Sequence, residues 1–225
     1  MRKYLLPVIV SLLSLGCAEA QRVNINAGGG LASHYGGSTR PVGAVKIGVS
    51  YEWELSTTWT LECGPEFYAK GFKDRNTEVY MRDSEGKLVL DDNGNPKMGK
   101  KNVSTTAYYV EVPIKANYYI ELRPLHYIEL SAGPYAAVGV GGKRKTRGDT
   151  DETDEARRFF YEKNTFSERG VKRFDAGMRA AVAYEFNRQF AVGIEADFGM
   201  LRFSDSGGHN VSGLLTLSYR LPIDL

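Results

Sequence analysis

The feature that most constrains this chain is a strict alternation of apolar residues with small, polar or charged ones. Successive side chains of a β-strand point to opposite faces, so a period of two predicts strands with one apolar face. Eight such runs are present, two of them weaker: Val23–Leu31, Val45–Trp53, Trp59–Ala69, Tyr108–Tyr118, Ile128–Val138, Phe174–Phe186, Phe190–Met200 and Val211–Leu221. We therefore expect an all-β chain with eight strands.

The length of the runs separates two classes of all-β protein. A soluble sandwich has strands of about five or six residues, whereas tilted strands that cross an outer membrane need about 9–11. The connections are short at Leu55–Thr58, Glu121–His126 and Asn187–Gln189, but about thirty residues long at Lys73–Ser104 and Gly141–Lys172. Short turns on one side and long loops on the other are typical of outer-membrane barrels. We predict an antiparallel up-and-down transmembrane β-barrel with two long extracellular loops.

The second face of these runs carries more charge than a soluble core could bury, because each buried ion must be paired or costs several kcal/mol. An inverted barrel removes this conflict, since the apolar face then meets lipid and the charges pair across a narrow lumen. Aromatic residues such as Trp59 and Phe190 gather at the short-turn ends, as expected near a membrane–water boundary. The predicted lumen charge network consists of Lys46, Glu62, Glu66, Lys70, Glu111, Lys115, Glu129, Asp175, Arg179, Glu185, Glu195, Asp197 and Arg220.

The first twenty residues have the features of a secretory signal peptide. A positively charged start precedes the apolar segment Leu5–Leu15, and an A-x-A cleavage site ends at Ala20. We expect a signal peptide over residues 1–20 and a barrel domain over 21–225, exported to the bacterial outer membrane. The alternative is a lipoprotein signal with lipid on Cys17. After cleavage at Ala20 only Cys63 would remain, which leaves no partner for an internal disulfide.

Candidate chemical sites are weak. The three histidines His34, His126 and His209 are expected in loops or turns, and Ser33 beside His34 has no acid partner that the sequence can place. The stretch Asp91–Asn95 has oxygen ligands like a calcium loop but lacks the glutamate at the twelfth position, and it is predicted to form a turn. We expect no enzyme activity, no cofactor and no metal site.

The overall charge balance excludes a generic nucleic-acid binder. The chain has 29 Lys+Arg against 27 Asp+Glu, without the basic excess of such proteins. One long loop holds the basic block Lys143, Arg144, Lys145 and Arg147, followed by the acidic stretch Asp149–Glu155. Two interpretations stay open: a solvated mobile loop whose blocks neutralise each other, or a surface that binds lipopolysaccharide phosphates.

Three segments carry a resemblance to a known family. Tyr109–Lys115, Gly133–Tyr135 and Arg173–Gly177 resemble the outer-membrane β-barrel domain family of PorT-like and OmpA-like eight-stranded barrels, loosely termed the porin family. The resemblance covers essentially the whole mature chain. It implies an eight-stranded barrel in a Gram-negative outer membrane and, through PorT, a link to protein secretion and gliding.

Three functions from different classes remain open at this point. The first is a non-enzymatic, monomeric outer-membrane barrel in contact with membrane lipid, whose surface loops meet lipopolysaccharide or an unidentified protein partner. The second is a small porin-like diffusion channel, although eight strands leave an interior only wide enough for side chains. The third is a soluble lipocalin-like barrel that binds a lipid, which would need an apolar lumen. The charged lumen favours the first.

Overall fold

The computed structural model describes residues 21–36, 38–74, 77–81, 87–149, 158–205 and 207–223. Its strands are β1 (Gln21–Tyr35), β2 (Thr39–Arg40), β3 (Val42–Glu54), β4 (Trp59–Cys63), β5 (Glu66–Asp74), β6 (Thr77–Tyr80), β7 (Met98–Arg123), β8 (His126–Asp149), β9 (Arg158–Lys163), β10 (Phe174–Phe186), β11 (Phe190–Arg202) and β12 (His209–Ile223). A short 3₁₀ helix, η1 (Thr165–Ser167), precedes β10. Within the described ranges, no helix has the length and apolar character needed to span a membrane.

The long strands close into an antiparallel ring in the order β1, β3, β4 with β5, β7, β8, β10, β11 and β12. β4 and β5 act as one strand, because each keeps the same register against β3 and β7 on either side of Gly64 and Pro65. Proline has no N–H to donate, so the ladder is interrupted there. β12 closes the ring by pairing with β1 along its whole length. The predicted eight-stranded barrel is confirmed.

Three tight turns join neighbouring strands at one end of the ring. Leu55–Thr58 joins β3 to β4, Pro124–Leu125 joins β7 to β8, and Asn187–Gln189 joins β10 to β11. Antiparallel neighbours need only a few linking residues. These turns lie where the sequence placed the short connections.

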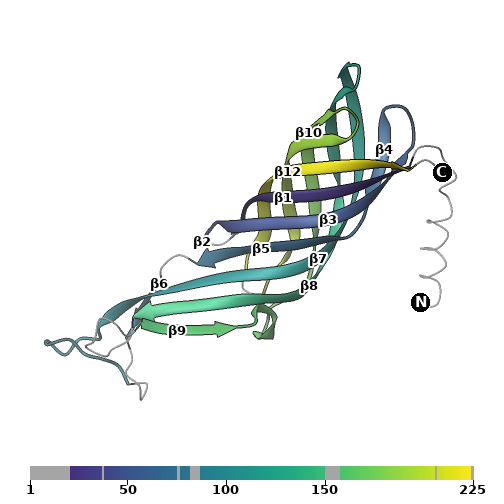
Figure 1. Ribbon diagram of the computed structural model, residues 1–225. Helices are drawn as coiled ribbons and strands as arrows, with labels where there is room; N and C mark the ends of the chain where they lie inside the picture. Colours follow the sequence, from purple (N-terminus) through teal and green to yellow (C-terminus); the bar gives the residue numbers. More distant parts are fainter. Residues whose placement is uncertain are drawn as a thin grey trace, which may run out of the picture.

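At the other end, β7 and β8 continue well past the ring (Figure 1). Their pairing extends from Ala107 opposite Gly142 to Lys101 opposite Gly148. β6 pairs with β7 and β9 pairs with β8 in this region. We call the result the projecting sheet: β6, β9, residues 98–106 of β7 and residues 143–149 of β8. Much of the two intervals expected as loops is therefore strand.

The two faces of the ring differ as the alternation predicts. On β3, Ile47 is 60% exposed on the outer face, while its neighbour Lys46 is 6% exposed on the inner face. Aromatic rings lie on the outer face near the short turns, where Trp59 packs against Tyr118 with centroids 4.9 Å apart. The apolar face therefore points away from the barrel axis and the polar face points into the lumen.

Candidate functional site

The charged interior is the chemically distinctive part of the barrel. All the residues predicted for the lumen charge network lie on the inner face, and none is more than 7% exposed. Strand pairing brings acids opposite bases: Arg179 on β10 faces Asp197 on β11. In the same way, Glu62 on β4 faces Lys115 on β7.

Arg179 is the centre of the network. Its Nη1 lies 2.6 Å from Glu66 Oε2 and its Nη2 lies 2.6 Å from Glu111 Oε1. Its Nε lies 2.7 Å from Asp197 Oδ1 and 3.3 Å from Glu195 Oε1. Guanidinium presents five donors in a planar fork, so one side chain can link carboxylates from several strands. Arg179 thereby connects β10 with β5, β7 and β11 through the interior.

Lys70 extends the network toward the end of the ring that carries the projecting sheet. Its Nζ lies 3.1 Å from Glu111 Oε2 and 3.0 Å from Asp175 Oδ2. Three tyrosine rings surround the ammonium at 4.9–5.0 Å from their centroids, namely Tyr68, Tyr109 and Tyr135. An ammonium over aromatic faces gains further electrostatic attraction. Lys70 is thus held on several sides by strands of the ring.

Two more lysines contact acids around the lumen. Lys46 Nζ lies 2.5 Å from Glu195 Oε1 and 3.4 Å from Glu66 Oε1. Lys115 Nζ lies 3.0 Å from Glu62 Oε2. Because Glu66 and Glu195 also contact Arg179, Lys46 belongs to the same connected cluster.

A second cluster lies near the short turns and is centred on Arg220 of β12. Its Nη1 donates to Glu185 and, at 2.7 Å, to the Tyr119 hydroxyl, while its Nη2 donates to Glu129. The backbone N–H of Arg220 donates to the Gln189 carbonyl in the β10–β11 turn. This contact places the cluster at the short-turn end of the lumen. The interior is therefore bridged at two levels.

Two members of the second cluster were absent from the predicted network. Glu52 is fully buried and accepts from Thr60 Oγ1 at 2.6 Å and from the Tyr119 hydroxyl at 2.6 Å. Glu52 shares the inward parity of Lys46 in the same run, so the alternation could have placed it. Arg22, whose Nη1 lies 3.7 Å from Glu185 Oε1, precedes the weaker first run by one residue and lacks that signal.

The end of the lumen beneath the projecting sheet is capped by aromatic rings. His34 of β1 is buried, with its ring centroid 3.7 Å from Phe72 and 5.0 Å from Phe203. The turn η1 places Phe166 beside Tyr109, with ring centroids 5.8 Å apart. A 3₁₀ helix as short as η1 has no periodic sequence pattern, so the sequence did not indicate Phe166 as a capping residue.

The expectation that the histidines lie in loops or turns is wrong. His34 belongs to β1, His126 to β8 and His209 to β12. The strands extend past the clear alternation, because backbone pairing continues where the outer face is no longer apolar. His34 Nε2 lies 2.9 Å from Asn210 Oδ1, so this ring is part of the interior packing.

Between the two charged levels lies an internal cavity of about 30 Å³, bordered by Lys46, Glu62, Lys115, Glu195 and Arg220, among others. A water molecule needs about 10–15 Å³ of such space, so about two waters fit. Among the described residues, no three His, Cys, Asp or Glu side chains are grouped so that they could hold a metal ion. The interior is filled by side chains that pair with one another.

The basic block lies in strand β8 and not in a loop. Lys143 and Lys145 reach Glu162 of β9 at 3.7 and 3.6 Å, and Arg144 reaches Glu168 at 2.6 Å. Arg147 is opposite Asn102 in the register, but its side chain lies outside the described residues. Most of the acidic stretch that was expected to neutralise the block, residues 150–155, also lies outside them.

The stretch that resembles a calcium loop forms a turn at the tip of the projecting sheet. Asp91 Oδ1 accepts the backbone N–H of Asn95 at 2.8 Å and that of Asn93 at 2.9 Å. These two donors, Asn95 first, lower the pKa of the Asp91 carboxyl below its ordinary value. The carboxylate is engaged within its own turn, as predicted from the turn residues.

No curated protein matches the sequence. Among solved structures, the attachment invasion locus protein Ail of Yersinia pestis is similar at 11% identity and a TM-score of 0.40, covering 91% of this chain and 99% of Ail. Neisserial surface protein A is similar at 12% identity and a TM-score of 0.41, covering 89% and 96%. The N-terminal barrel domain of Pseudomonas aeruginosa OprF gives 13% and 0.35, covering 90% and 100%. Likeness at this level says nothing about ligands or partners.

A family-level match covers most of the described barrel. The sequence model described as outer membrane protein beta-barrel domain matches residues 21–203, from β1 into the connection after β11. The matched span contains seven of the eight ring strands, together with the charged interior they carry. The chain therefore belongs to the outer-membrane β-barrel domain family.

Proposed function

We propose that the protein is a closed, non-enzymatic outer-membrane barrel that holds the projecting sheet outside the cell for contact with envelope or external partners. The observation that carries this proposal is the extension of β7 and β8 past a ring whose interior is filled. Catalysis or transport would need an accessible polar site, whereas the charged groups here pair with one another. The strands outside the ring instead offer accessible backbone and side chains.

The sidedness of the barrel follows from its turns. Short turns of outer-membrane barrels face the periplasm, so the projecting sheet is assigned to the cell exterior. An epitope tag in the Asn93–Gly94 turn should be detected on intact cells, because that turn lies at the tip of the projecting sheet. A matched tag in the Pro124–Leu125 turn should be detected only after the outer membrane is permeabilised. The reverse pattern would contradict the proposal.

A partner on the projecting sheet can be tested by photo-crosslinking. A crosslinking residue at Lys97, which is exposed near the tip, should give adducts with macromolecules at the cell surface. The same residue at Leu217, exposed on the outer face of the ring, should give lipid adducts only. Identical adducts at the two positions would reject the projecting sheet as an interaction surface.

Lipopolysaccharide is the second proposed contact. Arg40, Lys73, Ser104 and Lys145 are successive cross-strand partners from β2 to β8 and therefore share one face. Lys73 has the same outward parity as Phe67 on β5. The basic row therefore lies on the outer face of the barrel, just beyond its apolar band, at the level expected for the phosphate groups of lipopolysaccharide. Replacing Lys73 and Lys145 together by Gln should weaken binding of lipopolysaccharide micelles, while Lys97→Gln at the tip should not. Equal binding by both variants would count against this contact.

Two further proposals concern export and cellular role. Residues 1–20 lie outside the described part of the chain. N-terminal sequencing of the mature protein should begin at Gln21, and a lipid on Cys17 would contradict this.

The resemblance to PorT supports a role in secretion or gliding. A strain that lacks the protein should then secrete less protein or glide more slowly, and unchanged secretion and gliding would reject the role.

A further inference from the structure

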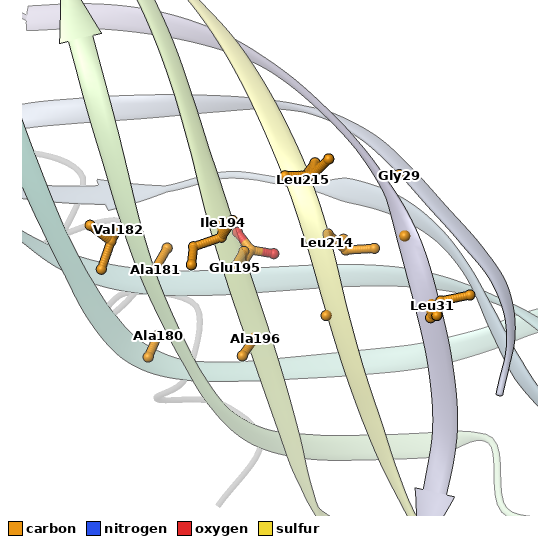
Figure 2. Close-up of a pocket in the computed structure, with 12 residues that line it drawn as sticks. Gly29, Leu31, Ala180, Ala181, Val182, Ile194, Glu195, Ala196, Leu214 and Leu215 are labelled. Carbon is orange, nitrogen blue, oxygen red and sulfur yellow. The ribbon is translucent and has the colours of Figure 1, made fainter. Parts of the chain in front are cut away.

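The outer face of the ring is hollowed on one side. A groove of about 680 Å³ crosses β10, β11, β12 and β1 (Figure 2). Its floor is made of the small residues Ala180, Ala196, Gly213 and Gly29. Its walls are larger apolar side chains, among them Leu215 at 68% exposed. The wall of the barrel is thin here, since the inner-face residues Ala181 and Glu195 also border the groove.

Three of the small floor residues are aligned by strand pairing. Ala180 lies opposite Ala196, and Ala196 lies opposite Gly213. The same row continues through Ala132 on β8, which does not border the groove. Four neighbouring strands about 4.8 Å apart make the groove about 14 Å wide. This width suits several hydrocarbon chains side by side better than a single chain.

The depth of the groove follows from its place on β11. Ala196 is six residues from Phe190 at the short-turn end and six residues from Arg202 at the other end. Six strand residues span about 20 Å, which at a tilt of about 40° is about 15 Å along the membrane normal. Half of a bilayer's hydrocarbon thickness is about 15 Å. A lipid with its headgroup at Arg202 would thus extend its chains to the groove.

The rim above the groove is basic. Lys172 and Arg202 are exposed there, and the backbone N–H of Lys172 donates to the Phe203 carbonyl next to Arg202. Arg173 does not belong to this rim, because its guanidinium donates to the Gly139 carbonyl at 3.0 Å and lies over the Phe166 ring of the lumen cap. The nearby acid Asp205 lies 3.7 Å from Lys172 Nζ, which leaves the rim with a net positive charge. Cations at the level where the apolar face ends complement a phosphate group. The rim therefore offers a charged contact and the groove an apolar contact, and the two are separated by about the hydrocarbon thickness of one leaflet.

We propose that one lipopolysaccharide molecule occupies this site, with phosphate at the rim formed by Lys172 and Arg202 and acyl chains in the groove. The proposal rests on the sidedness given above, which places the rim in the outer leaflet. Lipopolysaccharide carries several acyl chains on one phosphorylated headgroup, which fits both the width of the groove and the positive charge of the rim. A phospholipid or a second copy of the barrel are the competing occupants.

The test uses the full-length protein in detergent, with bound lipopolysaccharide measured by native mass spectrometry. Ala196→Leu fills the groove floor, and Ala132→Leu makes the same change in the same row outside the groove. Both changes are made in the Lys73→Gln, Lys145→Gln background, which lacks the other proposed lipopolysaccharide contact. In that background, we expect Ala196→Leu to retain at least fivefold less lipopolysaccharide than Ala132→Leu. Gly213→Leu should behave like Ala196→Leu, because a Cβ at Gly213 meets no atom within 4 Å and the fold should accept it.

The phosphate contact is tested on the same instrument. Arg202→Gln should reduce retention of lipopolysaccharide but leave that of its dephosphorylated form unchanged, and Arg123→Gln at the short-turn end should change neither. Equal retention by Ala196→Leu and Ala132→Leu would overturn the proposal. So would preferential retention of phosphatidylglycerol by the unmodified barrel, or a dimer that Ala196→Leu converts to monomer. Folding of each variant is checked first by heat-modifiable gel migration, and the sidedness is tested separately by the epitope tags.

Discussion

Arg179 holds four carboxylates because its guanidinium combines a permanent charge with donors that point in different directions. A lysine has a single charged point and could not reach Glu66 and Asp197 with the same geometry. Removing a buried partner is costly, since the remaining charges stay buried without compensation. The stability of the interior therefore depends more on this residue than on any exposed ion pair.

Arg179→Met should lower the free energy of unfolding by about 3–5 kcal/mol, because it leaves the buried Asp197 without its ion pair and takes one cationic partner from three further buried carboxylates. The matched control is Lys143→Met, which removes an ion pair to Glu162 whose lysine side chain is 57% exposed. That change should cost less than about 1 kcal/mol. Urea unfolding in lipid vesicles measures both. Similar losses for the two variants would show that the interior network contributes little.

At the scale of the strand, close approach depends on glycine at one inward position of β10. A Cβ on Gly177 would lie 2.1 Å from the Phe198 carbonyl oxygen and 2.8 Å from Gly199 Cα of β11. Both contacts are with backbone, so β10 and β11 would have to separate. Gly29 on the outer face of β1 is different, because a Cβ there meets no atom within 4 Å.

Gly177→Ala should therefore destabilise the barrel by about 1–3 kcal/mol, the usual cost of overpacking. Gly29→Ala should leave the unfolding free energy within about 0.5 kcal/mol of the original value. Refolding yield and urea midpoint in vesicles report both variants. An unaffected Gly177→Ala barrel would mean that β10 and β11 are not as close as described.

The turn at the tip of the projecting sheet should depend on pH through Asp91. Its pKa is lowered in the folded state by the N–H groups of Asn95 and Asn93. The ionised group therefore favours the turn above the ordinary pKa of an aspartate, and this contribution is lost as pH falls through the lowered value. The protection factor of the Asn95 amide, which corrects its exchange rate for the intrinsic dependence on pH, should fall over that range in the original protein. In Asp91→Asn this fall should be absent, and its persistence would assign the effect to another group.

Much of the ring could be predicted from the sequence, because lipid on one side and a polar lumen on the other impose the alternation. Lys46 between Val45 and Ile47 shows the principle. The same reasoning explains what was missed. In the projecting sheet, inner positions are polar as well: Thr105 and Thr146 are buried beside Ser104 and Lys145. The alternation of apolar with polar residues is therefore lost there, although these residues are in strands.

The site was predictable only as a set of inward positions. Alternation placed Glu66, Glu111 and Arg179 on the same inner surface, but distances across the lumen depend on strand register. Register is a property of pairs of strands, and the alternation within a single run does not determine which residues of two strands lie opposite each other. The meeting of Arg179 with carboxylates from β5 and β7 therefore became visible only in the structure.

For the whole molecule, the balance of interior charge matters. The buried residues of the described chain include nine carboxylates and six lysines and arginines. Most of these cations consequently contact more than one acid, as Lys46 does with Glu66 and Glu195. The excess of acids gives the interior a negative potential, which repels anions and attracts cations.

The purified barrel should show no large, steady conductance in planar bilayers, because side chains fill the lumen and the cavity has room for about two waters. Any small residual current should be selective for cations, because of the excess of carboxylates. Ion selectivity is measured from the reversal potential in a salt gradient. Reproducible nanosiemens-scale channels, or a preference for anions, would contradict the description of the interior.

The seam between β1 and β12 has a consequence for how the chain reaches this structure. It joins residues that are about 200 positions apart in the sequence. Contacts of such long range are slow to form, because loop closure must precede any gain from pairing. Until β12 is in place, β1 has an unpaired edge that can join another chain. In lipid, each unpaired backbone group costs several kcal/mol. A sheet that lacks its last strand is therefore unstable in the membrane and cannot be an inserted intermediate. Newly made chains must therefore be kept apart from one another until β12 is available. Closure of the ring and its insertion into the membrane then occur together.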